Sequence, residues 1–123
     1  MIAEIVSNHQ GDVELAKRLV DLAKSAGANA VKFQLRDMEA LYRQSGDNAS
    51  AGEDLGAQYT MNLLAKYSLS NSQMVEVLDR CKSVDIDAFC TPWDLPSLRV
   101  LAEYGVPALK IAAADLTNHL LLR

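Results

Sequence analysis

Two lysines stand at equivalent places in two short apolar segments. Residues 27–33 read Gly-Ala-Asn-Ala-Val-Lys-Phe, and residues 105–111 read Gly-Val-Pro-Ala-Leu-Lys-Ile. Each segment follows an amphipathic stretch and has the pattern of a buried strand, in which Lys32 and Lys110 face away from their apolar neighbours. A buried ammonium group is costly unless a negative group meets it. The pair therefore predicts a binding site for an anion, such as a phosphate or carboxylate of a ligand.

Other polar residues fall on the same predicted surface. Glu4 and Gln34 belong to the inner faces of two strands, and Thr91 closes a third strand. Ammonium and hydroxyl groups suit a phosphorylated or doubly anionic ligand. A carboxylate beside them could act as a general acid or base, or hold a substrate hydroxyl. The competing interpretation is that Glu4 and one lysine form an ion pair that only fixes the core, and the second lysine argues against it.

The elements that would position these residues alternate between strands and helices. Apolar patterns and turn residues predict strands at residues 2–6, 30–34, 88–91 and 108–112. Helices are predicted to begin at Asp12, Ser70 and Asp94, because these residue types are favoured at helix N-caps. Ser70 and Gln73 also have the spacing of a capping box. This alternation favours a parallel sheet with right-handed crossovers.

The expected fold class is α/β, with parallel βαβ units that form the first half of a (β/α)8 TIM barrel. Four strands cannot close such a barrel, and in a complete one the site lies at the carboxyl ends of the strands. Residues 1–123 are assigned to this one half-barrel. A long loop is predicted at about residues 36–62, where Gly, Ser, Asn and Asp interrupt the pattern. Loops of this length in a compact domain are usually functional or mobile.

Composition argues against several classes of protein. Half of the residues are hydrophobic, so a substantial core is possible, and the formal net charge of −4 argues against a nucleic-acid-binding surface. The sequence shows no apolar run long enough for a transmembrane helix and no secretory signal. Cys81 and Cys90 have neither metal-site nor disulfide-framework spacing. We therefore expect a reduced, cytoplasmic setting.

Four further residues have a chemical and a structural interpretation. His9 could carry a proton or bind a metal, but a loop histidine that hydrogen-bonds the backbone is the commoner case. Cys90 aligns with the two lysines in the third strand, and we expect it to be a small core residue. Trp93 could stack on a ligand or cover the rim of the barrel. Asp94 is most simply explained as an N-cap.

Five short segments, the first of which holds two motifs, occur in order along nearly the whole chain. They are Ile-Ala-Glu-Ile and Asn-His-Gln-Gly-Asp within residues 2–12, Val-Lys-Phe-Gln at 31–34, Thr-Pro-Trp-Asp at 91–94, Val-Pro-Ala-Leu-Lys-Ile at 106–111 and Asp-Leu-Thr-Asn at 115–118. Together they resemble the sialic acid synthases (N-acetylneuraminate synthases). The motifs do not distinguish N-acetylneuraminate synthases from legionaminate or pseudaminate synthases, or from a spore-coat polysaccharide relative.

The resemblance implies a transferase of carbohydrate biosynthesis that forms a carbon–carbon bond. Such an enzyme condenses phosphoenolpyruvate with an N-acetylated amino sugar, for example N-acetylmannosamine, and releases phosphate. Each site residue then has an implied role. Lys32, Thr91 and Lys110 would bind phosphoenolpyruvate, Gln34 and Asp115 would lie near the sugar, and Glu4 would act at the reacting centre as a general acid/base or an orienting group.

The resemblance also implies a divalent metal, Mn or Mg, that polarises the aldehyde of the sugar. The family's metal-binding histidines lie in the second half of the barrel, so no metal ligand is assigned within residues 1–123. A homodimer or other homo-oligomer is expected. Ala113 stands where the family has a serine that binds phosphoenolpyruvate, which removes one hydrogen bond. The chain by itself is expected to be inactive or nearly so.

Two alternatives remain beside this interpretation. A half-barrel exposes strand edges, and open edges favour pairing, so the chain could be a non-catalytic assembly or binding module. It could also belong to another phosphoenolpyruvate-dependent 2-keto-acid synthase, such as one that makes 3-deoxy-octulosonate phosphate. The segment at residues 8–12 argues against this last possibility.

Overall fold

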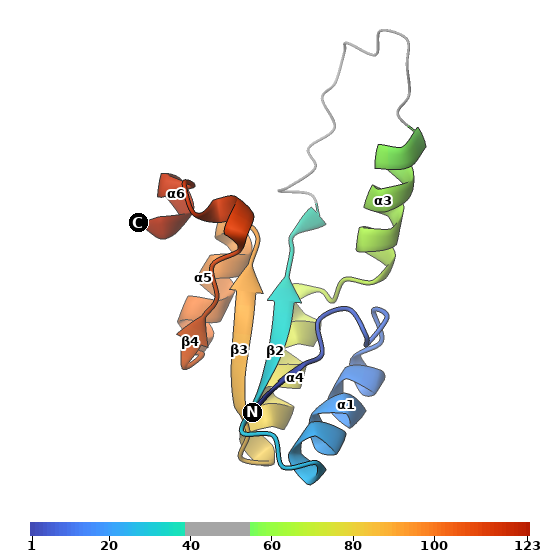
Figure 1. Ribbon diagram of the computed structural model, residues 1–123, viewed down its shortest axis with the longest axis vertical. Coiled ribbons are helices and arrows are strands. Elements are labelled where there is room, and N and C mark those ends of the chain that lie inside the picture. The colour runs from blue at the N-terminus through green and yellow to red at the C-terminus, as the bar shows by residue number, and fades with distance from the viewer. Residues whose placement is uncertain (39–54) are drawn as a thin grey trace, which may run out of the picture.

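A parallel β-sheet with helices against one face forms the body of the protein (Figure 1). The computed structural model describes residues 1–38 and 55–123. In these ranges the strands lie in the order β1-β2-β3-β4, all parallel. The elements are β1 (Ile2–Glu4), α1 (Val13–Ser25), β2 (Ala30–Leu35), α3 (Leu55–Lys66), α4 (Asn71–Ser83), β3 (Asp87–Pro92), α5 (Leu95–Tyr104), β4 (Ala108–Leu109), the 3₁₀ helix η1 (Ala113–Asp115) and α6 (His119–Leu122). The predicted α/β class with a parallel sheet is confirmed.

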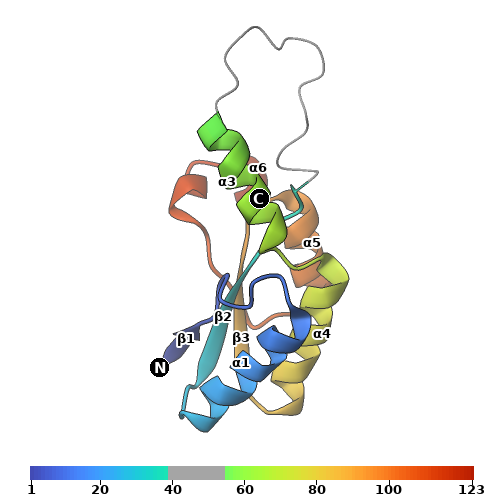
Figure 2. The same ribbon diagram turned by 90° about the vertical axis from the view of Figure 1, so that its right-hand side faces the viewer.

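The hydrophobic core lies between the sheet and helices α1, α4 and α5, which cover the same side of the sheet (Figure 2). Val31, Phe33 and Leu35 of β2 point into it, and each is at most 1% exposed. Ala88 and Cys90 of β3 join them. We call this side the helix face. Since side chains alternate along a strand, Lys32 and its like-facing neighbours belong to the opposite side, which we call the open face.

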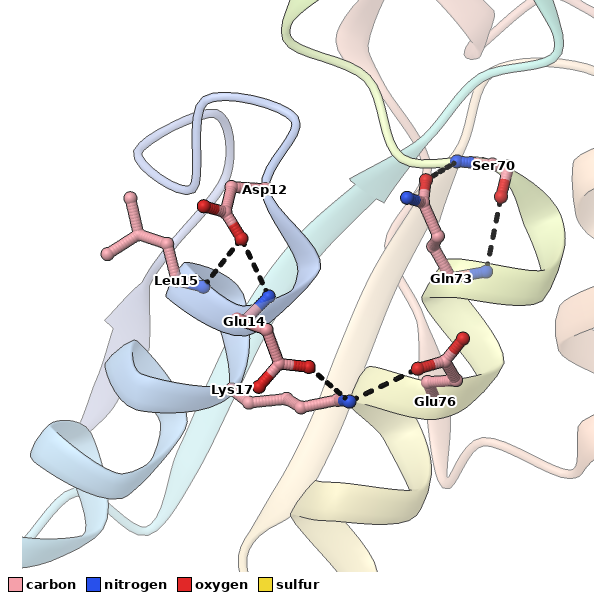
Figure 3. A network of polar contacts seen from close by, with 7 residues as sticks. All are labelled: Asp12, Glu14, Leu15, Lys17, Ser70, Gln73 and Glu76. Atoms are coloured by element: carbon pink, nitrogen blue, oxygen red, sulfur yellow. Dashed lines mark hydrogen bonds and ion pairs between the residues drawn. The ribbon is translucent and has the colours of Figure 1, made fainter.

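The helices of the core begin where the sequence predicts. Asp12 Oδ1 accepts hydrogen bonds from the backbone N–H groups of Glu14 and Leu15. Ser70 and Gln73 form the complete capping box at the start of α4. Both caps are drawn in Figure 3, which also shows Lys17 of α1 between Glu14 and Glu76, at 2.9 and 3.1 Å. The Lys17–Glu76 ion pair joins α1 to α4 across the outer surface.

Helices α1, α4 and α5 are each followed by one residue in the left-handed conformation. Gly27 and Gly105 have φ angles of 81° and 79°, and Asp85 has 56°. After each of them the chain makes the same return bond to the helix, as in Ala28 N–H to Ala23 C=O. Asp85 adopts this conformation without being glycine, as short polar residues sometimes do. The turns explain why Gly27-x-x-Ala30, Asp85-x-x-Ala88 and Gly105-x-x-Ala108 look alike in the sequence.

The register of β3 corrects one expectation. Ala30 pairs with Asp87, and Lys32 pairs with Phe89. Cys90 therefore pairs with Phe33 on the helix face, and the prediction that it takes the place of the lysines is wrong by one residue. A shift of one residue exchanges the two faces of a strand. Its role as a core residue is confirmed, and burial raises the pKa of the Cys90 thiol to about 12.

Three predicted boundaries also differ from the structure. β1 ends at Glu4 rather than residue 6, because Val6 turns the chain with a φ of 44°. β4 pairs only over Ala108–Leu109, and η1 follows at Ala113. The predicted loop at 36–62 ends too late, since α3 begins at Leu55. Residues 57–66 contain neither Gly nor Pro and include strong helix formers. The rest of that loop, residues 39–54, lies outside the described part of the chain.

Candidate anion site on the open face

The two lysines face the same hollow. It has a volume of about 380 Å³ on the open face of the sheet. Its lining residues come from all four strands and the end of β4: Ile2, Glu4, Lys32, Phe89, Ala108, Leu109 and Lys110. The structure thus brings together Glu4, Lys32 and Lys110, three of the six residues selected from the sequence.

Strand register places the two lysines at different heights in this hollow. Glu4 pairs with Lys32, Lys32 with Phe89, and Phe89 with Ala108, so these residues form one level. Lys110 lies two residues beyond Ala108, which is about 6.6 Å further along a strand. The ammonium groups can therefore meet different ends of one elongated ligand, or two anionic groups of it.

Lys32 is already paired with a carboxylate. Its Nζ lies 2.6 Å from Oε1 of Glu4, and the side chains are 15% and 63% exposed. The ion pair considered as the alternative interpretation is therefore present. Lys110, in contrast, is exposed and forms no ion pair or hydrogen bond through its side chain within residues 1–38 and 55–123. The hollow contains one neutralised and one uncompensated positive charge.

Thr91 stands one level above Lys32, towards the carboxyl end of β3. It pairs with Gln34 of β2, and alternation places both on the side of Lys32. Thr91 is buried, and its Oγ1 has no hydrogen-bond partner among the described residues. A buried hydroxyl normally has a partner, so this one is available to a ligand or a water molecule.

Gln34 takes part in a contact that the sequence analysis missed. Arg36 Nη2 donates a hydrogen bond to Gln34 Oε1 at 2.6 Å. The Arg36 guanidinium also lies 4.4 Å from the centroid of the Trp93 ring. Trp93 thus packs against a protein cation rather than standing free for a ligand. The i, i+2 spacing of Gln34 and Arg36 at the end of a strand could have predicted this contact, because it places both side chains on the same face.

Asp115 is not among the residues that line the hollow. It ends η1, is partly exposed, and its Oδ1 accepts a hydrogen bond from Asn118 Nδ2 at 3.0 Å. The same short helix begins at Ala113. This contact caps a turn after β4, so the structure gives Asp115 a local role beside its predicted contact with the sugar.

His9 and Asp94 have structural roles. His9 is 2% exposed, and its Nδ1 accepts a hydrogen bond from the Gly11 N–H at 3.0 Å. Burial lowers the pKa of His9, against a smaller opposing effect of a backbone hydrogen bond at Val6. Asp94 caps α5 by accepting from the Ser97 N–H at 2.7 Å. The predicted loop and N-cap roles are confirmed.

Metal-binding clusters and membrane-spanning helices are both absent from residues 1–38 and 55–123. No group of three or more His, Cys, Asp or Glu side chains in residues 1–38 and 55–123 is placed to hold a metal ion. Within the same ranges, no helix has both the length and the apolar character needed to cross a membrane.

Comparisons with known proteins identify the family. A model of the NeuB family matches residues 19–123. N-acetylneuraminate-9-phosphate synthase of Drosophila melanogaster is 35% identical over 100% of this chain and 33% of its own length. N,N'-diacetyllegionaminic acid synthase of Legionella pneumophila is 34% identical over 96% of this chain and 34% of its own length. The chain thus spans about a third of the length of these relatives.

A solved structure supports the architecture. N-acetylneuraminic acid (sialic acid) synthetase from Leptospira borgpetersenii serovar Hardjo-bovis, in complex with citrate, is 36% identical. It superposes with a TM-score of 0.79 over 98% of this chain and 38% of that one. The four parallel strands and their helices match the N-terminal part of a sialic acid synthase TIM barrel, as the sequence predicts. This chain belongs to the NeuB family, and sialic acid synthases are among its relatives.

Proposed function

We propose that this chain supplies the phosphoenolpyruvate-binding part of a nonulosonic acid synthase. The enzyme would condense phosphoenolpyruvate with an N-acetylated amino sugar, such as N-acetylmannosamine, and release phosphate. The observation that carries this proposal is the convergence of Lys32 and Lys110 on one hollow. The synthases similar to this chain are named for N-acetylneuraminate 9-phosphate and for diacetyllegionaminic acid, both of which contain N-acetyl groups.

The charge distribution of the hollow fits this ligand. Phosphoenolpyruvate carries a phosphate and a carboxylate, so it can use two ammonium groups at two heights. Thr91 adds a buried hydroxyl one level above Lys32. The similar Leptospira synthetase was solved in complex with citrate, which is also a small organic polyanion.

Binding would change the partner of Lys32. The anion competes with Glu4 for the ammonium group, which now lies 2.6 Å from the Glu4 carboxylate. Once displaced, that carboxylate stays beside the ligand. Formation of the new carbon–carbon bond turns the aldehyde oxygen into an alkoxide that needs a proton, and loss of phosphate requires addition of water. Glu4 is the residue we assign to one of these proton transfers, or to orienting the group that makes it.

A divalent cation, Mn or Mg, belongs to the proposal for the whole enzyme, where it would polarise the aldehyde. The described residues do not fit a metal, because they form no cluster of three donors of the usual types. We therefore assign no step of the reaction to a metal held by this chain. We also propose a cytoplasmic location, on the cysteine usage, and a homo-oligomeric enzyme, as the resemblance implies.

Titration calorimetry with phosphoenolpyruvate tests the anion site directly. Lys32→Ala and Lys110→Ala should each weaken binding by about 10- to 100-fold, since a hydrogen bond to a charged group contributes about 1.5–3 kcal/mol. Lys17→Ala is the matched control, because Lys17 is also ion-paired but lies on the helical surface. Equal affinities for all three variants and the unchanged chain would refute the site.

Turnover is a separate test. We infer that the isolated chain binds phosphoenolpyruvate but releases little or no phosphate with N-acetylmannosamine and Mn²⁺. The rate of phosphate release is compared with that of a full-length synthase of the family. Turnover at the rate of the full-length synthase would contradict the proposal that this part is inactive alone.

A second candidate function is suggested by the edges of the sheet. In the described residues, β1 and β4 are the edge strands of the sheet. Ile2 on β1 is 50% exposed and Leu109 on β4 is 36% exposed. Open edges favour pairing, so the chain could act as an assembly module. Sedimentation at several concentrations distinguishes the two functions, since a folded monomer at all concentrations would eliminate the assembly function.

A further inference from the structure

We propose that the protein has a second binding site, for a small neutral aromatic molecule of the size of phenol, on the helix face of the sheet. The site is a pocket of about 170 Å³ between α4, α5 and the amino ends of β3 and β4. We call it the helix-side pocket. Its walls include Leu78, Cys81, Ile86, Ala88, Tyr104 and Val106. The inference does not depend on the proposed function.

The volume of the pocket separates it from an ordinary packing defect. Protein interiors are packed as densely as organic crystals, and few voids in them are larger than a water molecule, which occupies about 30 Å³. An engineered apolar cavity of about 150 Å³ stays dry and binds benzene. At about 170 Å³, the helix-side pocket has room for one six-membered ring with a small substituent.

The buried walls of the pocket are apolar and uncharged. Leu78 and Cys81 of α4 are each 1% exposed, and Ala88 of β3 is 6% exposed. Burial raises the pKa of the Cys81 thiol to about 12, so the sulfur stays protonated and neutral. A neutral sulfur makes favourable contacts with the edge of an aromatic ring. Water would find few polar partners against these walls, which favours an apolar occupant.

Tyr104 gives the pocket a fixed aromatic wall. Its hydroxyl donates a hydrogen bond to Asp79 Oδ1 at 2.7 Å. The Lys82 Nζ lies 3.9 Å from the centroid of its ring, within the range of a cation–π contact. These two contacts hold the ring from its tip and from one face. A ring held in this way can pack offset or edge-to-face against a second ring, so the pocket favours an aromatic over an aliphatic ligand.

The mouth of the pocket favours a free small molecule over the side chain of a partner protein. Lys82 and Asp87 both line the pocket and are exposed. Charged residues are depleted at the centre of protein–protein interfaces, where a partner would have to cover them. A small molecule leaves both charges in water. The hydroxyl of a phenol at the mouth can also donate to the Asp87 carboxylate.

The helix-side pocket is separate from the hollow that contains Lys32 and Lys110. The two lie on opposite faces of the sheet, and β3 divides them. Ala88 lines the pocket, whereas the next residue, Phe89, lines the hollow. A molecule in the pocket therefore does not occupy the place of an anion in the hollow, and the two should bind without competition.

Titration of the ¹⁵N-labelled chain with phenol, followed by two-dimensional NMR, tests the site. We expect saturable shifts centred on the α4–β3 and α5–β4 turns, with a dissociation constant on the order of 1 mM or below. Val106→Phe fills the pocket and should weaken binding at least about tenfold, because the ring takes the place of the ligand. Val100→Phe is the matched control. Val100 is also half-buried, on α5, but does not line the pocket, so affinity should stay within about twofold.

Two further measurements complete the test. Ala88→Val fills the pocket from β3 and should weaken binding several-fold, which keeps the test decisive if Val106→Phe does not fold. Cyclohexanol has a similar size but no aromatic ring, so it should bind more weakly than phenol. Circular dichroism checks that each variant is folded.

The contrary outcomes are equally definite. The absence of saturable shifts up to about 20 mM phenol, or equal affinities in the folded filling variants and Val100→Phe, would overturn the site. Equal affinities for cyclohexanol and phenol would overturn its aromatic preference. Phenol binding should be unchanged when phosphoenolpyruvate is present. Competition between the two would place phenol in the hollow and overturn the inference, whereas failure of phosphoenolpyruvate to bind would overturn only the proposed function.

Discussion

The helix face and the open face of the sheet differ although the same strands build both. Along β2, Val31 and Phe33 are completely buried against the helices, while Lys32 and Gln34 alternate with them and remain partly exposed. The helix face has side chains that only pack. The open face has an ion pair, together with a lysine and a buried hydroxyl that have no partner among the described residues. Strand alternation thus lets one segment contribute stability on one side and ligand contacts on the other. Substitutions on the helix face should therefore mainly lower stability, and substitutions on the open face should mainly change ligand binding.

The largest expected effect comes from the helix face. Phe33→Ala removes a fully buried ring and should lower the free energy of unfolding by about 3–5 kcal/mol. Lys32→Ala, one residue away, should change it by only about 1 kcal/mol or less, because its partner Glu4 is mostly exposed. Urea denaturation measures both values. Similar losses for the two variants would break the comparison between the faces.

A smaller and opposite effect is expected on the open face. Glu4→Gln removes the carboxylate that competes for Lys32, so phosphoenolpyruvate should bind about three- to tenfold more tightly. The free energy of unfolding should change by less than about 1 kcal/mol. Calorimetry and urea denaturation provide the two numbers. Unchanged affinity combined with a clear loss of stability would instead support a purely structural ion pair.

The helix caps extend the comparison between the two faces, because they belong to the helices that cover the helix face. Ser70→Ala should destabilise the fold by about 1 kcal/mol, since the Gln73 N–H loses its acceptor. Ser83→Ala, at the other end of α4, is the control and should have less effect. Thermal unfolding followed by circular dichroism detects the difference. Binding of phosphoenolpyruvate should be the same in both variants, and a weaker affinity in either would be unexpected.

The smallest effect concerns pH. Burial lowers the pKa of His9 below its ordinary value of 6.5, so the unfolded chain takes up the proton first as the pH falls. The stability that neutral His9 provides is complete above about pH 6.5 and is lost as the pH falls towards the folded-state pKa. Urea midpoints at pH 7.5 and 5.5 should differ less in His9→Asn, which keeps an acceptor for Gly11. An equal difference would place the titrating group elsewhere.

Much of the fold could be predicted because its signals are local. Asp12, Ser70 and Asp94 cap their helices through contacts within three residues, and these follow from residue type and spacing alone. The parallel sheet also followed from the alternation of elements. The face on which Lys32 lies could be predicted from its own strand.

The rest depends on relations between strands that one segment does not encode. The face of the sheet on which Cys90 lies depends on the register of β3 against β2. The similar turns at Gly27 and Asp85 suggested a register that is one residue off. The Arg36–Trp93 stack joins the ends of two strands far apart in sequence, so neither motif predicts it. The difference in height between Lys32 and Lys110 appears only after the register is known.

Asp94 uses its two oxygens for different elements. Oδ1 accepts from the Ser97 N–H at the start of α5, and Oδ2 accepts from the Asp37 N–H after β2 at 2.8 Å. A residue that only caps a helix could be Ser, Thr, Asn or Asp with little difference in stability. Here Ser and Thr have only one oxygen, and Asn would turn an N–H group towards another N–H group. The requirement for two acceptors leaves aspartate as the single residue type that serves this position, which makes it far less replaceable than an ordinary cap.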